Sequence, residues 1–289
     1  MAFTILLHLR IVAMQKRDPL RLLGCQVAIP NVVCASDRDR HVASACERIS
    51  NYLADSTPVD LIVLPELCTL TYSREAFEAL DDLAEPLDGP SVTRFAELAR
   101  AVNAMVVFGM ARCTDTGFRI SQVILSETGK VVACYDKMHL CQYGASCEKE
   151  FFARGEKMAV VGLKGWKVAP LICYDIRIPE MTRALVLEHH ADLLLHCGAY
   201  FRDESFATWH SFATTRAMEN QTYLLSINRA GSQYGNSLFC FPWMDENHPA
   251  IAFAEHAEQF RIFELDPDLR ANTRYMYTFL KDRHAKYSL

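Results

Sequence analysis

The sequence predicts a single α/β domain. Apolar runs of strand length alternate with stretches of helical periodicity, and no repeat, low-complexity tract or linker interrupts them. Three of the strand-like runs each end in a chemically reactive side chain, namely Glu66, Lys137 and Cys173. Ligands usually bind at the carboxyl ends of strands in layered α/β folds. The pattern therefore predicts that a base, a cation and a nucleophile lie along one edge of the sheet structure.

The elements expected in the first half of the chain follow from periodicity. Helices are expected at 37–53 and 91–103, where apolar residues recur at helical spacing, and Ser91 is the expected cap of the second helix. Residues 126–129 are typical of a hairpin turn between two strands. The strands are expected at 22–28, 59–67, 105–110, 120–125 and 130–135.

The second half continues the alternation. A strand pair is expected at 157–161 and 166–173, and helices at 180–189 and 206–220. Further strands are expected at 192–197, 222–228, 237–241 and 259–265. We divide the chain into an N-terminal extension (1–21), one domain (22–270) and a charged, aromatic C-terminal tail (271–289).

The composition is that of an ordinary globular protein, with 51% hydrophobic and 22% charged residues in 289. A net charge of −5 and a pI of about 6.1 argue against nucleic acid or an anionic membrane as a partner, because both need a basic surface. Residues 1–14 are mainly apolar, with Arg10 interrupting the run, but they lack the features of a signal peptide and are too short to span a bilayer. We interpret them as an extension, or as sequence upstream of a start at Met14.

Eleven cysteines are scattered along the chain without a CxxC pair, so zinc-ribbon and thioredoxin-type motifs are absent. An odd count without an export signal predicts reduced thiols and a cytoplasmic protein. We expect most of them to be small core residues. No metal site and no organic cofactor are expected, because the chain has no Gly-rich phosphate loop and no HExxH motif.

Cys173 closes an apolar run and is followed by polar residues and Pro179-Glu180, which predicts a buried strand, a tight turn and a helix start. A thiol at such a turn is expected to lie near backbone N–H groups, which favour the nucleophilic thiolate. Free cysteine is also among the most buried residue types, so this segment alone is better explained by a core cysteine. The segments that end in Glu66 and Lys137 reverse that preference.

The three segments together resemble the nitrilase superfamily of carbon–nitrogen hydrolases, whose triad is Glu, Lys and Cys in that order. The matching stretches begin with Leu64-Pro65-Glu66 and Tyr135-Asp136-Lys137-Met138-His139-Leu140. The third runs from Ile172-Cys173-Tyr174-Asp175 to Pro179-Glu180, and further agreement comes at 216–221 and 234–237. The Cys-Tyr-Asp-Ile-Arg pattern is similar to the amidase branch called Nit or ω-amidase.

This resemblance implies a four-layer α-β-β-α sandwich. It also implies a homodimer or a higher homo-oligomer in which two sandwiches stack, with the tail 271–289 as a possible dimer contact. In the roles that the family suggests, Cys173 is the nucleophile, Glu66 the general base and Lys137 the cation that stabilises the oxyanion. The expected partner is a small-molecule amide, with no nucleic acid and no membrane.

Several further residues are candidates for substrate binding. Many relatives have a second glutamate ahead of an aromatic residue; Glu148 is favoured over Glu150 by its spacing to Gly155. Arg177 either binds a substrate carboxylate or pairs structurally with Asp175 or Glu180, and the structural pair is slightly favoured. The remaining candidates are Tyr72, Tyr174, Tyr200 and Trp209.

The function that the sequence favours is hydrolysis of a small linear amide to an acid and ammonia through a cysteine thioester. An N-carbamoyl amidohydrolase, which also releases carbon dioxide, is the first alternative. A nitrilase is the second, and a non-catalytic binding domain is the third.

Overall fold

The computed structural model describes residues 17–284 and 286, and these residues form two six-stranded sheets. The predicted extension 1–21 lies mostly outside the described residues, and so do positions 285 and 287–289 of the predicted tail. The first sheet has the order β12 (Gln259–Leu265), β1 (Leu20–Gln26), β2 (Leu61–Val63), β3 (Met105–Thr114), β4 (Gly117–Leu125) and β5 (Val131–Asp136). The second has the order β11 (Ile251–Ala252), β10 (Leu238–Cys240), β9 (Tyr223–Ile227), β8 (Leu193–Cys197), β7 (Trp166–Ile172) and β6 (Val161–Leu163).

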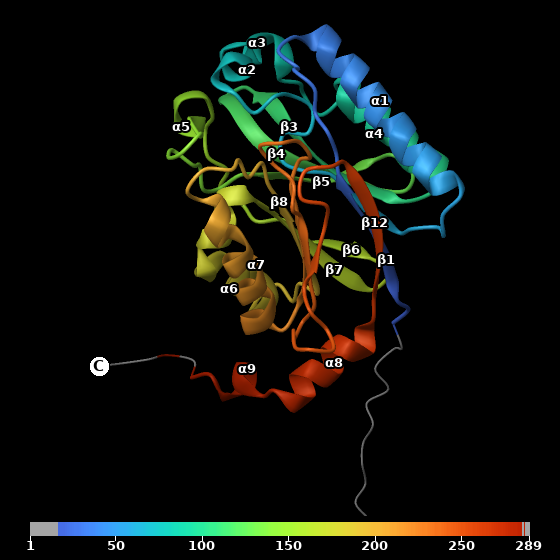
Figure 1. Cartoon of the computed structure of the whole chain (residues 1–289), viewed down its shortest axis with the longest axis vertical. Helices are drawn as coiled ribbons and strands as arrows, with labels where there is room; N and C mark the ends of the chain where they lie inside the picture. The colour runs from blue at the N-terminus through green and yellow to red at the C-terminus, as the bar shows by residue number, and fades with distance from the viewer. Residues whose placement is uncertain (1–16, 285, 287–289) are drawn as a thin grey trace, which may run out of the picture.

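Helices cover the outer face of each sheet (Figure 1). The pair α1 (Ala35–Ala54) and α4 (Pro90–Val102) lies on the first sheet, and the pair α6 (Pro179–Leu187) and α7 (Phe206–Asn220) lies on the second. Three apolar clusters separate these layers: one under each helix pair and one between the sheets. The predicted four-layer α-β-β-α sandwich is therefore confirmed.

Strand alternation explains how both faces of each sheet are buried. In β1, Leu20 and Leu22 face the opposite sheet, whereas Leu23 and Cys25 face α1 and α4. Successive side chains of a strand point to opposite faces, so a strand buried on both faces reads as an almost continuous apolar run. The core strands β1, β2 and β3 are parallel, as are β7, β8 and β9. Their carboxyl ends meet at one edge.

Some local expectations are wrong. Helix α4 begins at Pro90 after an N-cap at Gly89, so Ser91 lies inside the first turn instead of capping it; proline is favoured at the first helical position. The strand expected at 157–161 is instead the short β6, which pairs with β7 around the turn at Lys164 and Gly165. The end of the chain, for which a charged, aromatic tail and no helix or strand were predicted, forms α8 (Pro267–Met276) and α9 (Phe279–Asp282).

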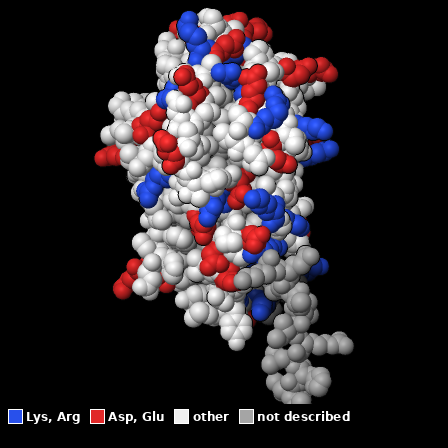
Figure 2. Space-filling model, turned by 90° about the vertical axis from the view of Figure 1, so that its right-hand side faces the viewer, with Lys and Arg blue, Asp and Glu red and all other residues white. Residues whose placement is uncertain are grey.

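Charged side chains of both signs are mixed on one face of the molecule. On the face shown in Figure 2, lysine and arginine are interspersed with aspartate and glutamate, and no extended basic patch is visible there. None of the described helices combines the length and the hydropathy that crossing a membrane requires.

Candidate active site

The three reactive side chains predicted from the sequence come from the ends of strands in both sheets. Glu66 lies in the turn after β2, Lys137 directly follows β5, and Cys173 directly follows β7. The first two strands belong to one sheet and the third to the other, so the site lies where the two sheets meet at their carboxyl edge. This is the edge at which layered α/β folds bind ligands.

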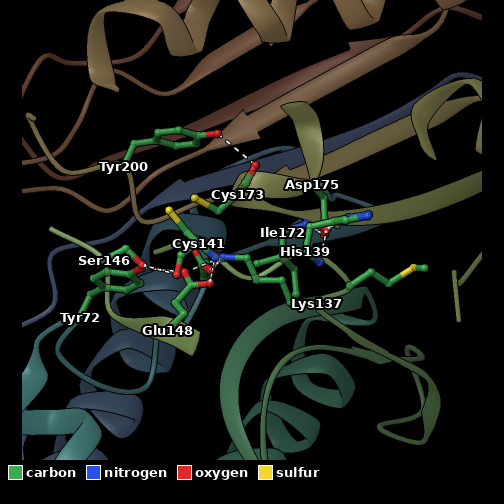
Figure 3. A network of polar contacts seen from close by, with 12 residues as sticks. Tyr72, Lys137, His139, Cys141, Ser146, Glu148, Ile172, Cys173, Asp175 and Tyr200 are labelled. Carbon is green, nitrogen blue, oxygen red and sulfur yellow. Dashed lines mark hydrogen bonds and ion pairs between the residues drawn. The ribbon is translucent and has the colours of Figure 1, made fainter. Parts of the chain in front are cut away.

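Lys137 lies between two buried carboxylates, those of Glu66 and Glu148, and Figure 3 shows it beside Glu148. Its Nζ atom is 2.7 Å from Glu66 Oε1 and 2.7 Å from Glu148 Oε1, and all three side chains are fully buried. The second oxygen of Glu66, Oε2, is buried without a hydrogen-bond partner among the described residues. The ammonium of Lys137 thus pairs with two carboxylates, and Glu66 Oε2 remains available to take a proton.

Burial and charge set the ionisation of this group. Burial raises the pKa of Glu66 to about 7, although the ammonium of Lys137 opposes the shift. Burial alone would lower the pKa of Lys137, but the carboxylates of Glu148 and Glu66 raise it well above its usual value. Lys137 therefore stays a cation at neutral pH, whereas the carboxyl group of Glu66 gains or loses its proton near neutral pH.

Glu148, and not Glu150, is the second glutamate at Lys137. It opens the short helix α5 (Glu148–Phe151), and its carboxylate also accepts hydrogen bonds from Tyr72 OH at 2.6 Å and from the Cys141 amide at 2.9 Å. Glu150 points to the surface, where it pairs with Arg74. Because both oxygens of Glu148 accept hydrogen bonds, three in all with that of Lys137, the carboxylate can hold Lys137 in a fixed place.

Cys173 has an unusual backbone conformation. It opens the 3₁₀ helix η1 (Cys173–Arg177) with φ at 44°, in the left-handed region that non-glycine residues rarely adopt. Burial raises the pKa of its thiol well above the ordinary value, and the charge of Glu66 raises it further, while Lys137 opposes both. The expected thiolate is therefore not the resting form. A neutral thiol beside a buried carboxylate needs that carboxylate as its base.

Asp175 joins the turn after β7 to the segment that carries Lys137. Its carboxylate accepts hydrogen bonds from the Ile172 amide at 3.0 Å and from Tyr135 OH at 2.6 Å, and it lies 2.8 Å from His139 Nδ1. Since Tyr135 and His139 flank Lys137 in the chain, Asp175 connects the nucleophile to the lysine.

A small pocket opens beside Cys173. Its walls include Arg177 and three other predicted substrate-binding residues, Tyr72, Tyr174 and Tyr200. Trp209 does not line it: its indole is fully buried behind Tyr200, stacked on that ring at 4.6 Å. A direct contact between Trp209 and substrate stays a prediction, and the structure gives it no support, because the indole is stacked on Tyr200 and does not line the cavity.

Arg177 also lines this pocket, and its structural pairing is not found. Neither Asp175 nor Glu180 forms an ion pair with it in the described part of the chain, so the slightly favoured interpretation is wrong. Its Nε and Nη2 atoms are buried and have no hydrogen-bond partner among the described residues. The guanidinium lies over Phe212 at 4.8 Å and near Tyr143 at 5.7 Å. Aromatic rings hold the cation but leave its N–H groups unused.

Glu66 is positioned by a backbone contact and by a buried arginine. The next residue, Leu67, also has a left-handed φ of 46°, and Arg229 Nη2 donates to its carbonyl at 2.6 Å and to that of Leu70 at 2.8 Å. Gly109 of β3 lies against the same turn; a Cβ there would come within 2.4 Å of the Pro65 carbonyl oxygen. The base thus depends on a glycine in the neighbouring strand.

Comparison with known proteins places this geometry in a family. The model of the carbon-nitrogen hydrolase family matches residues 25–275, which is most of the chain. The chain belongs to the carbon–nitrogen hydrolase family. It is 32% identical over 252 residues to a protein of Pseudomonas protegens named as a hydrolase, and the alignment covers 85% of each chain. It is also 34% identical to the ω-amidase YafV of Escherichia coli, over 60% of this chain and 63% of that protein.

Solved structures of carbon–nitrogen hydrolases have the same fold. Nit3 of Saccharomyces cerevisiae, described as a member of branch 10 of the nitrilase superfamily, superposes with a TM-score of 0.78 at 23% identity. The superposition covers 90% of this chain and 94% of that one. The predicted resemblance to the nitrilase superfamily and the predicted enzyme class, a carbon–nitrogen hydrolase of the amidase type, are confirmed.

Sequence reasoning missed several residues of this hydrolase site. Arg229 and Gly109 hold the Glu66 turn, and Cys141 lines the pocket next to Cys173. His196 contacts the Cys173 carbonyl from β8. A polar residue inside the apolar run 192–197 was a signal that could have found His196. The sequence of the loop that contains Cys141 has no feature that predicts a position in the pocket for this residue.

Proposed function

We propose that the protein hydrolyses the C–N bond of a small linear amide through a thioester on Cys173. The observation that carries this proposal is the buried Glu66–Lys137–Glu148 group beside a partly exposed thiol, with one oxygen of Glu66 unpaired. Burying three charged groups is costly unless they are matched. A base, a cation and a nucleophile brought together at one site are the components that amide hydrolysis needs.

In the proposed acylation, Cys173 Sγ forms a bond to the carbonyl carbon while its proton moves to Glu66 Oε2. The carbonyl oxygen gains negative charge, which Lys137 Nζ and the backbone N–H of Tyr174 stabilise; one such donor is typically worth about 3–4 kcal/mol. The C–N bond then breaks as Glu66 returns the proton to the leaving nitrogen, which departs as ammonia.

In the proposed deacylation, a water molecule attacks the thioester carbonyl as Glu66 takes one of its protons. The C–S bond breaks, the carboxylic acid leaves, and the proton returns to Cys173 Sγ. Glu66 thus acts as base and acid in turn, a role that suits a carboxyl group whose pKa is raised by burial to about 7. Glu148 keeps Lys137 in place while the charge on Glu66 changes.

Arg177 favours substrates that carry a carboxylate. A guanidinium with two unpaired buried nitrogens, facing the pocket beside Cys173, is suited to a bidentate contact with a carboxylate. One relative bears the name ω-amidase, in agreement with amide hydrolysis. We therefore propose that the substrate is the monoamide of a short dicarboxylic acid.

The function is tested by screening amides, N-carbamoyl compounds and nitriles for ammonia release, with Cys173→Ala as the control. Ammonia from amides, abolished in the variant, supports the proposal. Release of carbon dioxide as well would indicate a carbamoyl amidohydrolase, and consumption of nitriles without amides a nitrilase. Full activity in the Cys173→Ala protein, or no turnover of any compound by the native protein, would overturn the proposal.

The role of Arg177 is tested with Arg177→Met, which keeps the length of the side chain but removes its charge. For a monoamide of a dicarboxylic acid, kcat/KM is expected to fall by roughly 100-fold, since a hydrogen bond to a charged group contributes about 1.5–3 kcal/mol. For an uncharged aliphatic amide of the same length, kcat/KM is expected to change less than about threefold. Equal losses for both substrates would contradict a carboxylate site.

Two further proposals concern the protein's setting. We propose a homodimer in which α8 and α9 take part, because Tyr275 and Met276 of α8 are 81% and 70% exposed and Phe279 of α9 is 40% exposed. We also propose a cytoplasmic location, supported by eleven cysteines that are all unpaired.

A further inference from the structure

The carbonyl oxygen of Cys173 accepts hydrogen bonds from two buried side chains. His196 Nε2 lies 3.0 Å from it, and Tyr200 OH donates to it at 3.1 Å (Figure 3 shows the second contact). Cys173 is in the left-handed region, which costs a non-glycine residue about 1–3 kcal/mol. Such strain persists only where the surroundings hold the residue in place. These two donors are therefore part of what holds the nucleophile.

A chain of hydrogen bonds continues behind His196. His196 Nδ1 lies 2.7 Å from Ser226 Oγ, and Trp209 Nε1 donates to the same oxygen at 2.7 Å. His196 and Ser226 are register partners on β8 and β9, and both are buried. Their neighbours on the face that packs against α7, such as Leu194 and Leu224, are apolar. Two polar side chains in an apolar layer are costly unless each is satisfied, as both are here.

The chemistry of the two ends fixes the direction of this chain. An indole N–H only donates and a carbonyl oxygen only accepts. His196 Nε2 therefore carries the proton that is donated to the Cys173 carbonyl. In a neutral ring Nδ1 is then unprotonated and accepts from Ser226 Oγ, which itself accepts from Trp209. Burial lowers the pKa of His196 to about 4, which agrees with a neutral ring.

The bond to the Cys173 carbonyl has a consequence on the other side of the same peptide group. In a trans peptide the C=O and the following N–H point in opposite directions. Donors that fix the Cys173 carbonyl therefore also fix the direction of the Tyr174 N–H, the second oxyanion donor of the proposed reaction. Hydrogen bonds accepted by the carbonyl also polarise the peptide and strengthen that N–H as a donor.

We propose that His196, held in its Nε2–H tautomer by Ser226 and Trp209, is a positioning residue that orients the Cys173–Tyr174 peptide for oxyanion stabilisation. The inference rests on the proposed function. It assigns a task to three buried residues that the reaction otherwise leaves unexplained, and it gives Trp209 a place behind the pocket.

The kinetic test compares two variants. His196→Gln can donate from a nitrogen near the Nε2 position, whereas His196→Leu fills a similar volume without a donor. Leu is expected to lower kcat on the order of 10- to 100-fold with KM little changed, because the oxyanion forms only during reaction. Gln is expected to restore most of kcat. Leu224→Ala, which leaves a cavity in the same layer, controls for lost stability and is expected to keep kcat within about twofold.

A purely structural role of His196 would not produce a loss of kcat in His196→Leu that His196→Gln restores. If His196→Leu folds and keeps the native kcat, or if Gln is no better than Leu at matched thermal stability, the inference is overturned. A loss of kcat in Leu224→Ala as large as in His196→Leu would also overturn it, because packing alone would then explain the effect.

The tautomer is tested without any substrate, from the nitrogen chemical shifts of the imidazole in the full-length protein. Protonated Nε2 and unprotonated Nδ1 are expected from pH 5 to pH 8 (roughly one unit or more above the lowered pKa), and Ser226→Ala is expected to disturb this state. A proton on Nδ1 in the native protein would contradict the inference even if amides are hydrolysed. Absence of all turnover would instead overturn the proposed function and the kinetic role together, while the shifts would still decide the tautomer.

Discussion

Lys137 is the residue around which the charges of the site are balanced. Burial is the main reason why the pKa of Glu66 rises instead of falling beside a cation, and the charge of Glu148 adds to the rise. Burial likewise raises the pKa of the Cys173 thiol, with a further contribution from Glu66, so the thiol is held in its neutral form. The site therefore holds the carboxylate of Glu66, whose basicity is raised, next to the protonated thiol of Cys173. General-base activation of a thiol requires this arrangement.

The pH dependence of activity follows from Glu66. The proposed base acts when ionised, so kcat/KM for an uncharged amide is expected to rise with pH and to level off above an apparent pKa of about 7. Glu148→Gln removes a negative charge that raises the pKa of Glu66, so the residual activity should have its midpoint at lower pH. Initial rates in constant-ionic-strength buffers measure both profiles. A midpoint that stays in place or moves upward in the variant would contradict this assignment.

At the scale of single residues, the sequence predicted residue types better than partners. Glu66, Lys137 and Cys173 could be found because each closes an apolar run, and Glu148 because of its spacing to Gly155. The thiol's ionisation could not be predicted, since it depends on burial and on a net charge contributed by four separate segments. The unpaired state of Arg177 depends on Phe212 and Tyr143, which lie far away in the chain.

At the scale of elements, the helix 206–220 and the strand 259–265 were predicted with the bounds that the structure has. The 3₁₀ helix at Cys173 was not predicted. Its form depends on Asp175, whose carboxylate accepts from the Ile172 amide, and on Arg216 of α7, which donates to the Ile176 carbonyl. Tertiary contacts of this kind override local propensity.

Gly109 offers a test of how strand β3 supports the base. A Cβ at this position would meet the backbone of Pro65, Glu66 and Leu67 at 2.4 to 2.8 Å. We expect Gly109→Ala to lower the free energy of unfolding by roughly 1–3 kcal/mol and kcat on the order of 100-fold, because Glu66 is displaced. Gly162→Ala is the matched control, since nothing lies within 4 Å of its added Cβ. Denaturant unfolding and initial rates measure both variants, and native kcat in Gly109→Ala would contradict the account.

At the scale of the whole molecule, the four layers explain why the site is rigid. Each sheet has an apolar cluster on both faces, and the catalytic turns leave the sheets where these clusters end. The outer helices also reach the site directly. His41 of α1 lies 2.9 Å from the carbonyl of Cys68, two residues beyond Glu66. The fold class could be predicted from the alternation of elements, whereas such contacts between layers could not.

The buried histidines predict how stability depends on pH. Burial lowers the pKa of His41 to about 4 from an ordinary value of 6.5. Between these values the unfolded chain binds a proton that the folded protein does not, so this contribution to the free energy of unfolding is lost as the pH falls from 6.5 towards 4. The loss amounts to about 3 kcal/mol at most.

The variant His41→Gln isolates this contribution, because the raised pKa of Glu66 has the opposite effect in part of the same pH range and is common to both proteins. Denaturant unfolding as a function of pH should show a shallower decline below pH 6.5 in the variant than in the native protein. Parallel curves for the two proteins would show that His41 is not buried in its neutral form.

The most direct test of the central claim is mass spectrometry of the protein quenched in acid during turnover of its best amide. Trypsin releases residues 168–177 as one peptide, whose only cysteine is Cys173. During turnover this peptide is expected to gain the mass of the acyl group, and the gain is expected to disappear when the substrate is exhausted. The Cys173→Ala protein is expected to show neither the adduct nor ammonia release. Steady ammonia release with the acyl group on another residue, or with Cys173 replaced, would contradict it.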